Sequence, residues 1–196
     1  MSKQPVGIDW RQARRQGARA TIIAAAWQVV HDDGLTALSL RELAKRAGVT
    51  TPTVYAYFDS KNDIFDAMFG EAAESFSATK AAIVETDDPH QNLAADARCF
   101  IEFCTEDVPR YQLLFQHSVP GFTPSPESYA PAVRELELTG HRLARNGVRD
   151  PRHVDLGTAL MTGQADQRLP NDPGDPPRAR PAHAVAATCC SHRSPP

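Results

Sequence analysis

The sequence predicts an all-α protein with a small N-terminal helix-turn-helix domain and a larger helical domain behind it. Apolar residues recur at three- and four-residue steps along most of the chain up to residue 169. Ser-Pro and Asp-Pro pairs stand where several helices should begin, and a glycine separates two short helical patterns near residue 48. We therefore expect a mobile leader (1–10), a helix-turn-helix domain (11–60), a helical domain (61–169) and a disordered tail (170–196).

The helix-turn-helix prediction rests on residues 38–63, which read LSLRELAKRAGVTTPTVYAYFDSKND. Ser39 and Glu42 form a capping box ahead of apolar residues at helical spacing, so a short amphipathic helix begins here. Gly48 ends that helix, because glycine readily takes the left-handed backbone of a tight turn. Val49 follows in a position to fill the angle between two helices.

A second helix follows directly. Thr50 or Thr51 can cap it, and Pro52 sits in the first turn, where its missing N–H does no harm. Val54 and Phe58 should face the core. The open face then consists of small, hydroxyl-bearing and tyrosine residues: Thr50, Thr51, Thr53, Tyr55, Ala56 and Tyr57.

Such a face suits the reading of DNA. Threonine methyl and hydroxyl groups fit base edges, and tyrosine hydroxyls fit phosphates. The next helix begins at Lys61, whose ammonium group and neighbouring amides can meet a further phosphate. An ordinary helical corner is the alternative interpretation of this pattern.

Charge is distributed unevenly along the chain. The net charge is −3, but residues 1–61 hold nine Lys or Arg against five Asp or Glu and carry +4, which leaves −7 for residues 62–196. Arg11, Arg14, Arg15 and Arg19 lead into the first helix, which should run to about Asp33. These arginines lie either along a DNA backbone or on a solvated helix face.

Residues 19–69 closely resemble the N-terminal domain of the TetR/AcrR family of transcriptional repressors. The resemblance is carried by Gly48-Val49-Thr50, Val54-Tyr55, Tyr57-Phe58 and Ser60-Lys61. It implies a ligand-responsive repressor that binds a palindromic double-stranded DNA operator as a homodimer. The residues expected at the DNA are Thr36, Arg41, Thr50, Thr51, Pro52, Thr53, Tyr55, Ala56, Tyr57 and Lys61.

The second half reads as a series of helices, beginning with a long one from 61 to about 84. Asp88-Pro89, Ser125-Pro126 and Asp150-Pro151 should cap and start later helices, and residues 118–126 are too rich in proline to be regular. Tyr111 to Phe115 followed by Pro120-Gly121-Phe122 resembles the ligand-binding and dimerisation domain of some family members. The candidates for lining an apolar effector pocket are Phe100, Phe103, Cys104, Tyr111, Phe115, Phe122 and Tyr129. Plain core packing is the alternative for each of them.

Other function classes find no support in the sequence. The four cysteines (Cys99, Cys104, Cys189 and Cys190) fit no zinc or disulfide spacing, so we expect neither metal nor cofactor. The seven histidines are scattered and no catalytic motif is present, which indicates a protein that is not an enzyme. The absence of a long apolar run or signal pattern indicates no membrane partner and a cytoplasmic location.

The tail departs from the family pattern. Seven of residues 170–196 are proline, and the segment contains no Leu, Ile, Phe, Met, Tyr or Trp. Family members usually end in one more amphipathic helix, which completes the dimer interface. The alternative function is therefore a repressor relative with a truncated or frame-altered C-terminus, impaired in dimerisation and operator binding.

Overall fold

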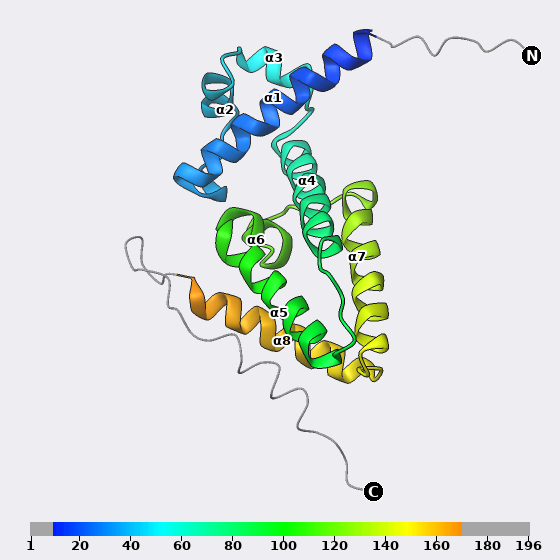
Figure 1. The fold of residues 1–196 in the computed structure, drawn as a ribbon. Helices are drawn as coiled ribbons and strands as arrows, with labels where there is room; N and C mark the ends of the chain where they lie inside the picture. Colours follow the sequence, from blue (N-terminus) through cyan, green and yellow to red (C-terminus); the bar gives the residue numbers. More distant parts are fainter. Residues whose placement is uncertain (1–9, 170–196) are drawn as a thin grey trace, which may run out of the picture.

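The computed structural model describes residues 10–169 and contains only helices in that range (Figure 1). The all-α prediction is confirmed. The expected disordered tail and all but the last residue of the expected leader lie outside the described residues. Trp10, counted with the leader, is the first residue of α1. Within residues 10–169, no helix is long and apolar enough to cross a membrane.

The head consists of four elements and the start of a fifth. They are α1 (Trp10–Asp33), the short 3-10 helix η1 (Leu35–Ala37), α2 (Leu40–Arg46) and α3 (Thr51–Tyr55). Their inner faces bury Ile22, Val29, Leu43 and Val54, and Phe58, just after α3, packs in the same core; each is at most 2% exposed. The head therefore has an apolar core of its own, against which the helix-turn-helix is packed.

The body contains α5 (Pro89–Glu106), α6 (Val108–Phe115), α7 (Pro126–Arg145) and α8 (Pro151–Arg168). Asp88, Ser125 and Asp150 cap α5, α7 and α8 through their side chains, with proline in each first turn. The starts of these three helices agree with the sequence prediction, because the capping signal is local.

Helix α4 (Lys61–Ala81) belongs to both parts: it begins beside α3 and ends deep in the body (Figure 1). It packs most extensively on α7, where a side chain on Gly70 would meet Ser128 Cβ at 3.4 Å. The helix ends at Ala81, three residues before the expected end. The following segment turns away, and Thr86 is held by Asn92, whose Oδ1 accepts from the Thr86 amide at 2.7 Å.

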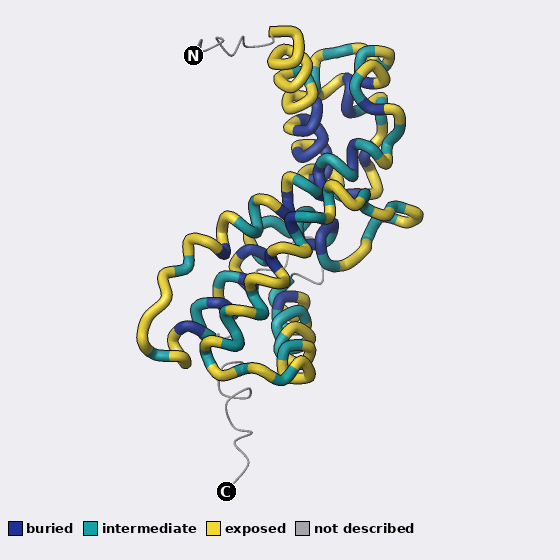
Figure 2. Tube along the Cα trace, turned by 90° about the vertical axis from the view of Figure 1, so that its right-hand side faces the viewer, coloured by how far each residue is buried: buried dark blue, intermediate teal, exposed yellow. Residues whose placement is uncertain are grey.

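One apolar cluster continues from the head into the body. It includes Trp27 of α1, Phe69 of α4, Phe103 of α5 and Leu113 of α6. Figure 2 shows the buried positions grouped inside the head and at its junction with the body. The Arg110 guanidinium of α6 lies 5.1 Å from the centre of the Trp27 ring, so a cation–π contact also joins the two parts.

Candidate nucleic-acid interface and ligand cavity

The turn between α2 and α3 has the geometry that its residues predict. Ser39 Oγ accepts from the Glu42 amide at 3.2 Å and caps α2. Gly48 has φ +67°, a left-handed backbone that disfavours other residues. The Val49 amide then donates to the Ala44 carbonyl at 2.9 Å, which closes the turn. Of the two proposed caps, Thr50 is the N-cap of α3, with Oγ1 accepting from the Thr53 amide at 3.3 Å.

The outer face of α3 presents the residues expected there. Thr50, Pro52, Tyr55 and Ala56 are exposed, while Thr51, Thr53 and Tyr57 are half-buried. The hydroxyl oxygens of Thr50 and Thr53 lie 2.8 Å apart and share a hydrogen bond. These two hydroxyls therefore also hold the helix start in shape, whereas Tyr55 is 52% exposed and available to a partner.

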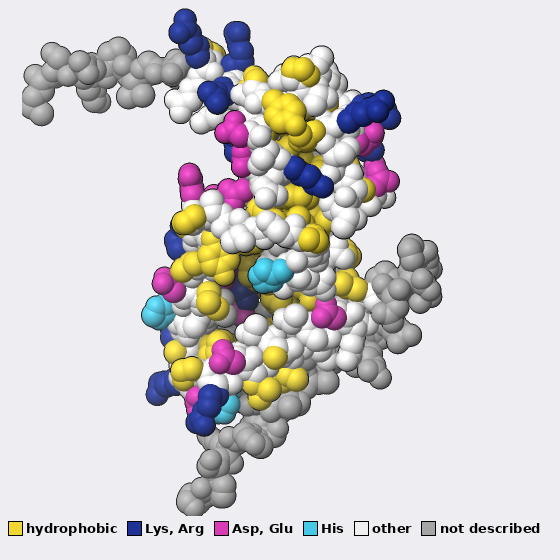
Figure 3. All heavy atoms as spheres, turned by 180° about the vertical axis from the view of Figure 1, so that it is seen from behind, with side chains coloured by type: hydrophobic (Ala, Val, Ile, Leu, Met, Phe, Trp, Pro, Cys, Tyr) yellow, Lys and Arg dark blue, Asp and Glu magenta, His cyan; other side chains and the backbone are white. Residues whose placement is uncertain are grey.

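A groove of about 510 Å³ lies between α3 and the beginning of α1. It is lined by Trp10, Arg11, Arg14, Arg15, Ala56 and Tyr57. Figure 3 shows Lys and Arg side chains gathered at this end of the head. Three guanidinium groups beside a tyrosine form an electropositive wall next to the exposed face of α3.

Arg19 contacts Tyr57, one of the residues that line this groove. One of its terminal nitrogens donates to the Tyr57 carbonyl at 3.0 Å, and its guanidinium carbon lies 4.2 Å from the centre of the Phe58 ring. The sequence offered DNA contact or a solvated face for Arg19. The structure places it in contact with the segment that follows α3, where it positions Tyr57.

The remaining predicted DNA contacts flank α3. Thr36 is exposed in η1, and Arg41 is exposed in the first turn of α2. Lys61 is the first residue of α4, which is capped by Ser60, and its ammonium lies 5.3 Å from the centre of the Phe65 ring. The DNA-contact roles of all ten residues stay predictions.

A cavity of about 200 Å³ opens in the body between α4, α5, α6, α7 and α8. Figure 3 shows the face of the body where a hollow lies among hydrophobic side chains. Of the seven residues proposed for its wall, Phe100, Phe115 and Tyr129 line it. Phe69 and Phe76 of α4 complete the aromatic part.

The other four candidates pack elsewhere. Phe103 and Phe122 belong to the cluster that joins head and body, and Cys104 and Tyr111 are fully buried between α5, α6 and α8. Their apolar character therefore reflects core packing, the alternative given for each from the sequence. Burial raises the pKa of the Cys104 thiol above its ordinary range, so this cysteine stays neutral.

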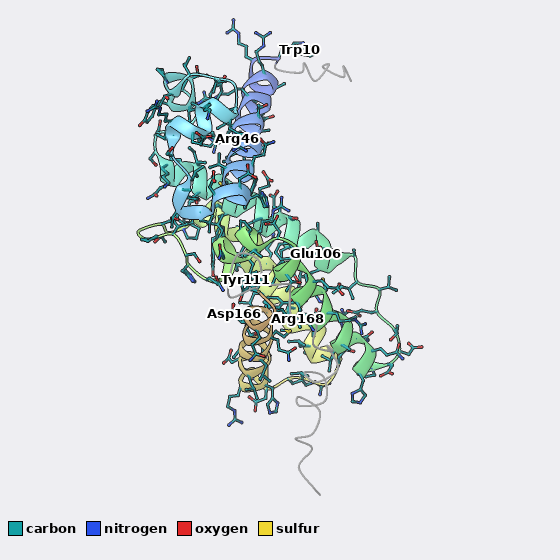
Figure 4. All side chains as sticks on the ribbon, turned by 90° about the vertical axis from the view of Figure 1, so that its left-hand side faces the viewer. Trp10, Arg46, Glu106, Tyr111, Asp166 and Arg168 are labelled. Carbon is teal, nitrogen blue, oxygen red and sulfur yellow. The ribbon has the colours of Figure 1, made fainter. Side chains whose placement is uncertain are left out.

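Tyr111 has a polar partner at its buried end. Its hydroxyl donates to Asp166 Oδ1 at 2.6 Å, and the two side chains point toward each other from α6 and α8 (Figure 4). Burial, followed by this hydrogen bond to a carboxylate, raises the pKa of the Tyr111 hydroxyl. The contact joins α6 to the last helix of the described chain.

Sequence reasoning missed the charged residues at the cavity. Lys80, Asp96 and Glu135 are each at most 6% exposed, and all three lie on its wall. Asp96 stands four residues before Phe100 on the apolar face of α5, a signal that was available in the sequence. Within residues 10–169, no group of three His, Cys, Asp or Glu is placed to hold a metal ion.

Comparison with known proteins supports the resemblance found in the head. Residues 22–68 match the family described as "Bacterial regulatory proteins, tetR family". The head of this chain therefore contains the N-terminal domain of that family. The match covers α2, the Gly48 turn and α3 completely, and it extends into α1 and α4 on either side.

The named relatives of this chain are regulators. The transcriptional activator FasR of Mycolicibacterium smegmatis is 32% identical over 118 residues, or 59% of this chain and 54% of FasR. The class A tetracycline repressor of Escherichia coli is 34% identical over 80 residues, or 41% of this chain and 37% of the repressor. The chain thus spans about half or less of these relatives' lengths. Their names agree with the prediction that the protein is not an enzyme.

Solved structures extend the likeness to the body. The TetR-family member SCO1917 from Streptomyces coelicolor has a TM-score of 0.62 and 25% identity, and the match covers 88% of this chain and 95% of that one. The multidrug binding protein EbrR, in complex with ethidium, has a TM-score of 0.64 at 24% identity, with coverage of 88% and 95%. At this identity EbrR supports the fold alone.

Proposed function

We propose that this protein is a TetR-family, ligand-responsive repressor that binds a palindromic operator as a homodimer. The observation that carries the DNA-binding part is the exposed face of α3 beside a groove lined by Arg11, Arg14 and Arg15. A helix that enters the major groove and an adjoining basic wall that meets the phosphate backbone are the two parts that sequence-specific DNA binding requires.

In this proposal the residues of the head divide into two groups. Thr50, Thr51, Thr53 and Ala56 face base edges, with Pro52 beside them. Phosphates are held by Thr36, Arg41, Tyr55, Tyr57 and Lys61, together with the arginines of α1. Two heads related by twofold symmetry would occupy half-sites about 34–36 Å apart, which is one turn of DNA.

Exposed apolar residues on α7 and α8 support a homodimer. Leu136 and Leu138 are 65% and 52% exposed, and Leu156 of α8 is 53% exposed. Exposed apolar side chains of this size are favourably covered by a second copy. The dimer would bring two heads to one palindrome.

The cavity supports a response to a ligand. Its wall includes Phe69 and Phe76 of α4, the helix that begins in the head at Lys61. A ligand that binds more tightly to one orientation of α4 shifts the population toward it and so changes the fit of the heads to DNA. The complex of EbrR with ethidium supports a small-molecule effector for this fold.

The first experiment measures the mass of the purified full-length chain by sedimentation over a concentration series. A mass of twice 21.4 kDa is expected. A monomer at every concentration would contradict the homodimer and favour the alternative of a relative impaired in dimerisation.

The second experiment selects binding sites from random duplex DNA and maps the enriched sequence by footprinting. The proposal predicts an inverted repeat with half-sites about one helical turn apart. Thr51→Ala should alter the selected sequence, while Thr79→Ala, at an exposed position on the body part of α4, should not.

A promoter carrying the selected site should become less active when the protein is present; higher activity would identify an activator instead.

A further inference from the structure

The helix proposed to read base edges lacks the side chains that most often identify a base. Residues 47–58, which contain the end of the turn, α3 and the segment after it, include no Arg, Lys, Asn, Gln, Asp, Glu or His. Arginine and lysine identify guanine, asparagine and glutamine identify adenine, and acidic side chains accept from cytosine, because each matches the edge of that base in the major groove. None of these contacts is open to α3.

The threonine hydroxyls of this face are partly used inside the protein. Those of Thr50 and Thr53 share a hydrogen bond of 2.8 Å, and Thr50 Oγ1 also accepts from the Thr53 amide at 3.3 Å. One of the two hydroxyl protons is therefore taken up within the helix start. A threonine hydroxyl both donates and accepts, so a single one of them does little to tell bases apart.

The remaining groups on this face are apolar. Pro52 and Ala56 are exposed, and the Ala56 amide donates to the Pro52 carbonyl at 3.1 Å, which places the two residues one helical turn apart on the same side. The threonines add a methyl group each, including that of Thr51 beside Pro52. The opposite side of the helix is fixed in the core by Val54, which is 0% exposed. A rigid row of small carbon groups therefore faces outward.

Thymine presents the matching group. Its C5-methyl is the apolar feature of the major groove, and alanine and threonine methyl groups make contact with it. Covering both partners removes apolar surface from water, which is favourable. The cations next to α3 are on other helices: Arg41 is in the first turn of α2, and Lys61 begins α4. Phosphate contacts by these two residues carry no sequence information, so base selection is left to α3.

We propose that α3 recognises its half-site through the C5-methyl groups of thymines, with Thr51, Pro52 and Ala56 as the contacting residues. This inference rests on the proposed DNA-binding function and adds the bases that are read. The half-sites should contain A·T pairs where α3 lies in the major groove. Recognition of this kind is lost when the methyl group is removed, even though every hydrogen-bonding group of the base pair is kept.

Site selection from two random duplex libraries tests the proposal with the full-length protein. One library contains thymine, and the other contains deoxyuridine in its place, which lacks only the C5-methyl group. We expect an enriched inverted repeat from the first library and no enriched sequence from the second. Enrichment of the same sequence from both libraries would overturn the proposal.

Gel-shift titrations of the selected duplex then locate the methyl groups that are read. Replacing one thymine at a time by deoxyuridine should weaken binding about threefold or more at each contacted position. The same replacement outside the footprint is the control and should change the affinity by less than about twofold. Unchanged affinity at every thymine of the half-site would contradict the proposal.

Two substitutions at Thr51 separate the methyl group from the hydroxyl. Thr51→Val keeps the methyl group and should bind the selected duplex within about twofold of wild type. Thr51→Ser keeps the hydroxyl and should bind it about threefold or more weakly, but should lose nothing further on a duplex whose contacted thymine is deoxyuridine. Thr79→Ser, at an exposed position of α4 in the body, is the matched control and should change neither affinity. Weaker binding by the valine variant but not by the serine variant would assign recognition to the hydroxyl and contradict the proposal.

The outcome is separable from that of the proposed function. A failure to enrich any sequence from the thymine library would contradict sequence-specific DNA binding itself, and this inference with it. A defined inverted repeat that keeps its affinity when its thymines are replaced by deoxyuridine would contradict the inference alone and leave the proposed function standing.

Discussion

The imidazole of His31 on α1 faces the carboxylate of Asp107 at the start of α6, with Nε2 3.1 Å from both carboxylate oxygens. The other ring nitrogen lies 2.6 Å from the Trp27 carbonyl, which fixes the orientation of the ring. The same carboxylate caps α6 by accepting from the Arg110 amide at 3.1 Å. One side chain therefore starts a helix of the body and binds the end of a helix of the head.

Asp107→Ala should be more destabilising than His31→Ala. The first change removes both the α6 cap and the contact with α1, and a lost cap alone costs about 0.5–2 kcal/mol. The second removes the partly exposed pair, worth about 1 kcal/mol or less, and the contact with the Trp27 carbonyl, but leaves the α6 cap in place. Urea unfolding of both variants measures the difference. Asp107→Asn, which can still cap, should fall between them; equal effects of the two alanine variants would contradict the double role.

Tyr57→Phe should weaken binding to the operator and to unrelated DNA by a similar factor. Its hydroxyl is proposed to hold a phosphate, and phosphate contacts carry no sequence information. Gel-shift titrations with operator and random duplexes at one salt concentration compare the two affinities. Tyr129→Phe, a tyrosine of the body, is the control. Unchanged affinity for both duplexes would remove the Tyr57 hydroxyl from the phosphate contacts.

Asp66→Asn should destabilise the protein at pH 7 but have little effect in acid. Burial of Asp66 on α4 favours its neutral form, but hydrogen bonds from the Ser125 amide and from the Ser128 and Ser125 hydroxyls outweigh burial and lower its pKa. A lowered folded-state pKa contributes stability above the unfolded-state value of about 3.9 and loses it as pH falls through the folded-state pKa.

Thermal unfolding of wild type and Asp66→Asn between pH 7 and pH 3 measures this effect. The two melting temperatures should converge toward the acid end. A constant difference over the whole range would show that the Asp66 charge plays no part in holding α7 to α4.

Lys80→Met should destabilise the body by about 3–5 kcal/mol, because it leaves a buried carboxylate without its nearest cation. The double variant Lys80→Met, Asp96→Asn should recover part of this loss, since the uncompensated charge is then absent. Chemical unfolding of both variants provides the comparison. A double variant no more stable than the single one would contradict the charge-pair explanation.

The helices could be predicted because their signals are local. Ser39, Gly48 and Thr50 each act within four residues, and the structure places each in its expected role at the cap or turn. The end of α4 was placed too late, because the contact of Thr86 with Asn92 depends on how two helices meet. Sequence spacing contains no such information.

The cavity was harder to predict for the same reason. Lys80, Asp96 and Glu135 come from three helices, and periodicity shows which face of its own helix a residue occupies but not the angle at which helices cross. Phe103 and Tyr111 are aromatic, as Phe100 and Phe115 are, and lie three and four residues from them. Each shares a helix face with its neighbour, and Phe76 contacts the rings of both Phe100 and Phe103, so helical spacing does not separate the core rings from those at the cavity.

The length of α4 sets the scale of any motion between its ends. Lys61 and Lys80 are separated by 19 helical steps of about 1.5 Å, or roughly 29 Å. If α4 pivots as a rigid rod about its cavity end, a tilt of about 5° displaces Lys61 by roughly 2.5 Å along an arc of that radius. This displacement is close to the full length of a hydrogen bond, about 2.7–3.2 Å. A rearrangement of a few degrees around one small molecule is thus amplified to the distance over which a contact with DNA is made or broken.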